Sequence, residues 1–95
     1  QHKKQYMEEQ GVKCITLPMQ SMLIRPEDIA HALFKQGIHS VLIEGGGKTA
    51  GAFIDAHLAD EVVAYCAPCI IGGESHHPVE GRGVALLSER ITFTH

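Results

Sequence analysis

The chain has 95 residues, of which 44% are hydrophobic and 20% are charged, and its 8 basic and 11 acidic side chains give a formal net charge of −3. This is the composition of an ordinary globular protein, so it excludes the disordered, collagen-like and disulfide-scaffold classes. No apolar run approaches the roughly 20 residues that span a bilayer. No long basic run is present either, so we expect neither a membrane nor a nucleic acid as the partner.

The start of the chain and its cysteines bear on its origin. The first residue is Gln1 rather than methionine, and nothing near it resembles a signal or transit peptide. We therefore expect residues 1–95 to be a piece of one longer domain. Cys14, Cys66 and Cys69 form no regular disulfide framework, which favours a reducing compartment, the cytoplasm.

Three segments carry helical signals. Polar, helix-favouring residues fill 3–10, and Gly11 follows at the position of a left-handed C-cap. Pro26 suits the first position of a second helix, and Gly37 suits its end. A third helical pattern covers residues 49–58.

Four short apolar or β-branched segments carry strand signals. They cover residues 12–17, 40–43, 61–66 and 90–94, and loops are expected over residues 19–24 and 70–83. Strands that alternate with helices imply crossover connections and a parallel sheet. The sequence therefore predicts an α/β fold in which helices flank a mostly parallel sheet, within a single domain or part of one.

The most informative segment is Glu44-Gly-Gly-Gly-Lys-Thr-Ala50, where a predicted strand ends in an acid and a helix begins after three glycines. Glycines let a backbone approach a ligand closely and allow positive φ. Free amides at a helix N-terminus, together with the helix dipole, suit a phosphate. The segment therefore predicts an anion site, and the alternative is a tight strand-to-helix turn that binds nothing.

Two nucleotide-binding motifs compete for this turn. A Walker A loop needs a glycine five residues before the Gly47-Lys48-Thr49 triplet, and that position is Leu42, which excludes this motif. The dinucleotide fingerprint G-x-G-x-x-A is satisfied by Gly45, Gly47 and Ala50. No acid follows the next predicted strand to hold a ribose hydroxyl, so the fingerprint is incomplete.

Residues 41–73 resemble the C-terminal reductase domain of bacterial riboflavin biosynthesis proteins. The family pattern is an apolar strand, Glu-Gly-Gly, a helix, Asp-Glu, a strand, and then Ala-Pro with a glycine near the following loop. The same features follow one another here with the same spacing. Residues 11–18 and 26–37 resemble the family's preceding strand and helix more loosely.

The resemblance implies a dihydrofolate-reductase-like three-layer fold and an NADPH-dependent pyrimidine reductase. Its substrate would be a small phosphoribosylaminopyrimidine, 5-amino-6-(5-phosphoribosylamino)uracil, reduced to the ribitylamino product in riboflavin biosynthesis. The resemblance assigns Glu44 to substrate binding. It assigns the phosphate end of NADPH to Gly45, Gly46, Gly47, Lys48, Thr49, Ala50, Gly51 and Ala52. We also expect a homodimer, and a preference for NADPH over NADH because no acid is placed to repel a 2′-phosphate.

The match has two departures and leaves two alternatives. Cys69 stands where the family commonly has a lysine, and Lys48 stands where small or apolar residues are frequent. We expect residues 1–95 to be the C-terminal half of the reductase domain and to be inactive alone. The alternatives are another dihydrofolate-reductase-like NADPH reductase and a non-catalytic α/β binding or assembly module. A cofactor titration separates the enzymes from the module.

A possible metal or redox site lies at Cys66 and Cys69, a C-x-x-C pair with His76 and His77 downstream. Zinc takes four ligands at a set spacing, and a redox pair opens a helix, whereas Cys69 precedes two isoleucines. We therefore expect the pair to be small core residues that bind no metal. Asp55 is expected to be a solvated helix residue.

Overall fold

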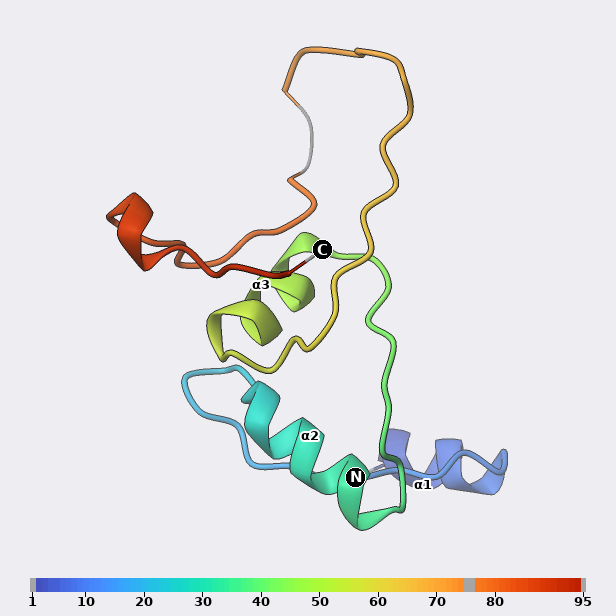
Figure 1. Cartoon of the computed structure of the whole chain (residues 1–95). Helices are drawn as coiled ribbons and strands as arrows, with labels where there is room; N and C mark the ends of the chain where they lie inside the picture. The colour runs from blue at the N-terminus through green and yellow to red at the C-terminus, as the bar shows by residue number, and fades with distance from the viewer. Residues whose placement is uncertain (1, 75–76, 95) are drawn as a thin grey trace. The chain divides into compact units, whose positions relative to one another are not determined.

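The structure is a computed structural model that describes residues 2–74 and 77–94, and the chain divides into two units, Gln1–His39 and Ser40–His95 (Figure 1). Three helices and one short 3₁₀ turn are present in the described residues. They are α1 (His2–Glu9), α2 (Pro26–Lys35), α3 (Gly47–Asp55) and η1 (Leu87–Glu89). All three predicted helices are thus confirmed, with ends that differ by a few residues from the predicted ones.

The first unit begins with α1, a helix of polar residues that buries none of its side chains. The chain leaves α1 through Gly11, whose φ of 81° lies in the left-handed region that glycine adopts without strain. The amides of Gly11 and Val12 donate to the carbonyls of Glu8 and Met7, each at 3.0 Å. These bonds satisfy carbonyls at the helix end, so the predicted C-cap is confirmed.

Helix α2 begins and ends where its sequence signals predict. Pro26 occupies the first turn, and Gly37 follows the last turn with a φ of 79°. The amide of Gly37 donates to the carbonyl of Phe34 at 2.9 Å, and that of Ile38 donates to Leu33 at 3.1 Å. Both bonds close the C-terminus of the helix.

An ion pair holds the start of α2. The Arg25 guanidinium donates to both carboxylate oxygens of Asp28, through Nε at 3.0 Å and Nη2 at 2.8 Å. The hydrogen bond from Arg25 is the largest effect and lowers the pKa of Asp28; desolvation opposes it, and the positive charge of Arg25 adds a smaller lowering effect. The same bond raises the pKa of Arg25.

This pair predicts an acid-sensitive start of α2. Because the pKa of Asp28 is lower in the folded chain than the ordinary 3.8, its stabilisation is present above that value and is lost as the pH falls through the folded pKa. A carboxyl ¹³C titration should therefore show Asp28 with a midpoint below 3.8. Arg25→Gln should raise that midpoint, and an unchanged midpoint in this variant would contradict the assigned cause.

Residues 19–24, predicted as a loop, contain a tight turn. Gln20 and Leu23 exchange backbone hydrogen bonds at 2.8 and 2.9 Å and form an isolated antiparallel bridge. The two central residues, Ser21 and Met22, both have positive φ, 50° and 65°. This is the backbone of a type I′ turn, which right-handed strand twist favours in hairpins.

The predicted α/β fold is wrong for the described residues, because they contain three short helices and no sheet. The segments predicted as strands (12–17, 40–43, 61–66 and 90–94) run without ladder partners. Apolar, β-branched runs favour extended backbone, but a strand forms only where a neighbour supplies hydrogen bonds and a layer covers its side chains. Neither is present here: Leu42 is 81% exposed and Tyr65 is 96% exposed.

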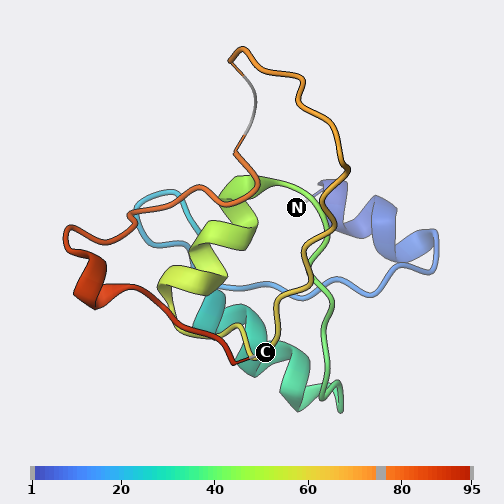
Figure 2. The ribbon, with the colours of Figure 1, turned by 45° about the horizontal axis from the view of Figure 1, so that its top comes forward.

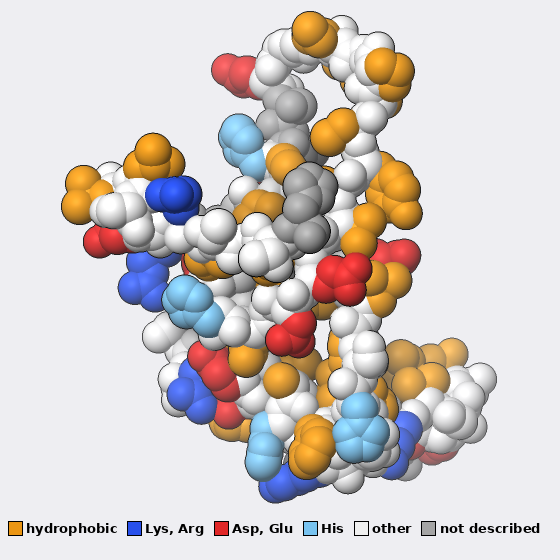
Figure 3. All heavy atoms as spheres, in the orientation of Figure 1, with side chains coloured by type: hydrophobic (Ala, Val, Ile, Leu, Met, Phe, Trp, Pro, Cys, Tyr) orange, Lys and Arg blue, Asp and Glu red, His pale blue; other side chains and the backbone are white. Residues whose placement is uncertain are grey.

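No hydrophobic side chain is buried in the part of the chain that the structure describes. Hydrophobic side chains are therefore visible at the surface in the space-filling view (Figure 3). The only buried residue described is Gly51, within α3. None of the helices described has the length and apolar character that a membrane crossing requires.

The second unit contains α3 and the segments that lie against it. Helix α3 ends in a Schellman arrangement, in which His57 donates its amide to Ile54 at 2.9 Å and Leu58 donates to Phe53 at 3.0 Å. The segment that follows residue 77 runs close to α3 in both ribbon views (Figures 1 and 2). It then forms η1, where the amide of Leu86 donates to the Glu89 carboxylate at 3.1 Å.

Candidate functional site

The turn that leads into α3 consists of glycines and carries no side chains of its own. Gly45 and Gly46 have φ values of 62° and 85°, and a β-carbon on Gly45 would meet no atom within 4 Å. The first helical bond runs from the Ala50 amide to the Gly46 carbonyl at 3.1 Å. No side chain caps the helix, so the amides of its first turn have no side-chain partner.

Gly47 and Gly51, unlike Gly45, are packed against another segment of the chain. They lie four residues apart on one face of α3, and the backbone of residues 77–81 lies directly against them. A β-carbon on Gly47 would clash with the His77 carbonyl oxygen, and one on Gly51 would overlap the Glu80 carbonyl. The amide of Glu80 donates to the Gly47 carbonyl at 2.9 Å. These two glycines are thus required by packing between backbones.

Asp55, the last residue of α3, makes the next contact with this segment. Its Oδ2 accepts the backbone amide of Arg82 at 2.7 Å. Gly81, the residue before Arg82, has a φ of 146°, and a β-carbon there would be 2.5 Å from the same carboxylate oxygen of Asp55. Asp55 is half-buried and hydrogen-bonded, so its interpretation as a solvated helix residue is wrong. We call residues 77–82 the strap.

The turn and the strap together enclose an open cavity of about 660 Å³. Its walls come from the start of α3 and from the first residues of the strap. They are Gly45, Gly46, Gly47, Lys48, His77, Pro78 and Glu80. The lining includes one lysine, one histidine and one glutamate. Backbone amides at a helix N-terminus beside a lysine are a favourable environment for an anion.

The cavity contains only part of the predicted cofactor site. Gly45, Gly46, Gly47 and Lys48 line it, and the remaining predicted residues do not. Those outside the lining are Thr49, Ala50, Gly51 and Ala52. Gly51 instead receives the Glu80 carbonyl.

Glu44 precedes the turn and is exposed. It does not line the cavity, and α3 has no side-chain cap, so Glu44 is not a cap of this helix. Glu44 does not end a strand as predicted either, because no sheet forms in the described residues. Its assignment to substrate binding stays a prediction from the family pattern.

Sequence reasoning missed His77, Pro78 and Glu80, which supply the second wall of the cavity. They lie in a segment of the chain predicted only as a loop. One signal could have indicated the contact: glycines at positions 47 and 51 recur at i, i+4 within a helical pattern. Such a spacing leaves one face of a helix without side chains, and another backbone can then approach it.

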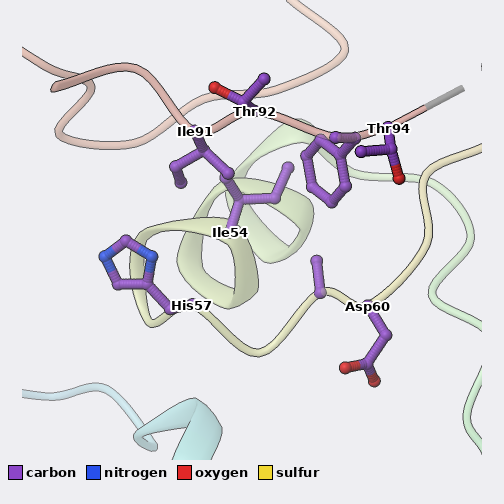
Figure 4. Close-up of a pocket in the computed structure, with 8 residues that line it drawn as sticks. Ile54, His57, Asp60, Ile91, Thr92 and Thr94 are labelled. Carbon is purple, nitrogen blue, oxygen red and sulfur yellow. The ribbon is translucent and has the colours of Figure 1, made fainter. Parts of the chain in front are cut away.

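A second hollow, of about 350 Å³, lies between the end of α3 and the C-terminal segment (Figure 4). Ile54 of α3 and Ile91 point toward one another there, whereas Asp60 and Thr92 point away from them. A ligand site needs polar groups that converge on the cavity. Polar residues line this hollow too, but Asp60 and Thr92 do not point into it, so we assign it no ligand and interpret the Ile54–Ile91 pair as an apolar contact between the C-terminal segment and α3.

The cysteine pair lies outside any core. Cys66 and Cys69 are free and exposed, so their interpretation as core residues is wrong, because no layer covers the segment that carries them. His77 lines the glycine-turn cavity, and His76 lies outside the described residues. Within the described ranges, no three His, Cys, Asp or Glu side chains gather as metal ligands. That the pair binds no metal stays a prediction.

Comparison of the sequence with known proteins identifies a family. The family model described as RibD C-terminal domain matches residues 1–94. The riboflavin biosynthesis protein RibD of Bacillus amyloliquefaciens is 39% identical over 71 residues, which cover 75% of this chain and 19% of that protein. The RibD protein of Escherichia coli K12 is 42% identical over 61 residues, covering 64% of this chain and 17% of that protein.

A third relative, RibD of Haemophilus influenzae, is 33% identical over 58 residues, or 61% of this chain and 15% of that protein. The matched part of the chain therefore covers less than a fifth of the length of these curated relatives. No solved structure matches it significantly.

Proposed function

The chain belongs to the RibD C-terminal domain family, and from this premise we propose that it is part of a pyrimidine reductase of riboflavin biosynthesis that uses NADPH. The proposal extends to the whole protein's reaction, the reduction of 5-amino-6-(5-phosphoribosylamino)uracil. It includes a homodimeric, cytoplasmic enzyme in which residues 1–95 belong to a single reductase domain. The observation that supports it is the family match, which includes the glycine turn. There the amides at the start of α3 have no side-chain cap and Lys48 lines the same cavity, so an anion can bind.

The residues present fit the phosphate end of such a cofactor. Gly45 leaves open space where a side chain would stand, so a phosphate can approach the amides of the first turn of α3. Lys48 lines the same cavity and supplies a positive charge that offsets part of the ligand's charge. A cavity of about 660 Å³ lies within the range typical of small-molecule sites.

Each part of the chain has a separate task in this proposal. When bound, the nicotinamide supplies the hydride, which is the chemistry of the cofactor itself. The turn and Lys48 bind and orient the phosphate end, and the strap closes the cavity from the other side through His77 and Glu80. Glu44, immediately before the turn and without a cap partner, is free to accept hydrogen bonds from N–H or hydroxyl groups of the substrate.

The proposal is tested by a comparison of NADPH with NADH in the full-length protein. We expect calorimetry to detect NADPH binding and to show a markedly weaker affinity for NADH, because no acid is placed to repel the 2′-phosphate. Lys48→Ala should weaken NADPH binding in a salt-dependent way, with Lys35→Ala as an exposed-lysine control. Equal affinities for both dinucleotides would contradict the preference, and no binding of either would contradict the proposed function.

A further inference from the structure

The strap is held to α3 by a small number of identified contacts. The Glu80 amide bonds to the Gly47 carbonyl, the Glu80 carbonyl lies against Gly51, and the Arg82 amide bonds to the Asp55 carboxylate. Among these contacts, only the Asp55 bond uses a side chain. It is therefore the contact that a conservative substitution can remove without altering the backbone of either partner.

The position of Asp55 at the end of α3 indicates that the bond to Arg82 has a specific role. A carboxylate at the last residue of a helix faces the negative end of the helix dipole, which disfavours it there. Here the carboxylate is half-buried and accepts a short bond from the Arg82 amide. Gly81 adds a second indication, because any β-carbon at that position would collide with the Asp55 carboxylate. The close approach of the strap to Asp55 therefore requires a glycine at position 81.

We propose that Asp55 is a positioning residue of the glycine-turn cavity: by holding Arg82, it fixes the strap so that His77 and Glu80 form the cavity's second wall. This inference rests on the proposed function, since it concerns the cavity assigned there to the cofactor. Asp55 does not line the cavity itself, so it acts through the strap rather than on the ligand.

The test uses Asp55→Ala and Asp55→Asn in the full-length protein, with Asp60→Ala as the matched control. Asparagine keeps an oxygen that can accept the Arg82 amide, whereas alanine does not. Asp60 is an exposed acid five residues further on, outside both the strap and the cavity that the strap walls. The first measurement is hydrogen exchange of a peptide that spans the amides of Glu80 and Arg82, and the second is the affinity for NADPH.

We expect Asp55→Ala to raise exchange in this peptide about fivefold or more, and Asp55→Asn to restore protection close to that of the unsubstituted protein. The KM for NADPH should rise by a similar factor in Asp55→Ala while kcat stays nearly constant, because the wall contributes to binding rather than to the transition state alone. Asp60→Ala should change neither quantity.

Unchanged exchange in Asp55→Ala would overturn the inference. Raised exchange with an unchanged KM and affinity for NADPH would overturn it too, because the strap would then not shape the site. If the unsubstituted protein binds no NADPH, the proposed function fails separately, and the exchange measurement still decides whether Asp55 holds the strap.

Discussion

Replacement of Glu44 by glutamine is expected to lower kcat/KM of the full-length enzyme about 30- to 1,000-fold, a loss of roughly 2–4 kcal/mol of transition-state stabilisation. Glu44 directly precedes the glycine turn. Its carboxylate does not cap α3, so it is free to bind a substrate. A carboxylate is a poor contact for a phosphate, because like charges repel, and Glu80 in the cavity lining opposes anion binding in the same way. A carboxylate is a good acceptor for the N–H and hydroxyl groups of a pyrimidine substrate.

The affinity for NADPH and the free energy of unfolding separate this role from a structural one. Both should stay nearly constant in Glu44→Gln, and Glu61→Gln, another exposed glutamate, should leave kcat/KM unchanged. Loss of a helix cap would instead cost about 1 kcal/mol of stability with little kinetic effect. Unchanged turnover in a destabilised Glu44→Gln protein would refute the substrate-binding role.

A single methyl group at Gly51 is expected to displace the strap and to weaken NADPH binding about tenfold. In an isolated helix, Gly→Ala stabilises by about 1 kcal/mol. In this chain the new β-carbon would overlap the Glu80 carbonyl, so the strap must move. It would then lose the bonds to Gly47 and Asp55, each of which contributes on the order of 1 kcal/mol.

Circular dichroism and calorimetry together check this expectation. The helical signal of Gly51→Ala should be equal to or greater than that of the unsubstituted protein, while the NADPH affinity falls. Gly73→Ala is the control: its φ of 78° makes alanine strained there, but a β-carbon would meet no atom within 4 Å, so backbone strain without a clash should leave the NADPH affinity unchanged. Undiminished NADPH affinity in Gly51→Ala would show that the strap does not shape the cofactor cavity.

The helices could be predicted from the sequence because their signals are local. Pro26 and Gly37 bound α2, and Gly11 ends α1, through backbone preferences that depend on a residue and its nearest neighbours. The start of α3 shows the limit of such signals. The sequence pattern predicts that this helix begins at residue 49, whereas residues 47 and 48 already lie in it. Glycine has a poor helix propensity, so Gly47 gives no local signal of a helix.

The absence of a sheet from the described residues could not be predicted, since pairing between strands is not local. Residues 40–43 and 61–66 have the β-branched composition of strands, yet no partner in the described residues supplies a ladder. Composition reports a tolerance for extended backbone, whereas a sheet also requires a neighbour and a covering layer. The interpretation of Cys66 and Cys69 as core residues failed for the same reason, because it assumed that layer.

About half of the cavity lining followed from the sequence. The turn at residues 45–48 has a local signature, and it lines the cavity. His77 and Glu80 reach the same cavity only because Gly47 and Gly51 admit the strap. Contacts between segments about thirty residues apart leave only weak traces in a single sequence, and glycines spaced by four residues are one of them.

The central claim is that the uncapped turn at the start of α3 holds the phosphate end of NADPH. Amide chemical shifts of the full-length protein, followed by NMR during a titration with NADPH, test it most directly. We expect the largest shifts at the amides of residues 45–49, with smaller shifts at His77 and Glu80 and none at Ile91 in the second hollow. Saturable NADPH binding that leaves the amides of residues 45–49 unshifted would contradict the claim.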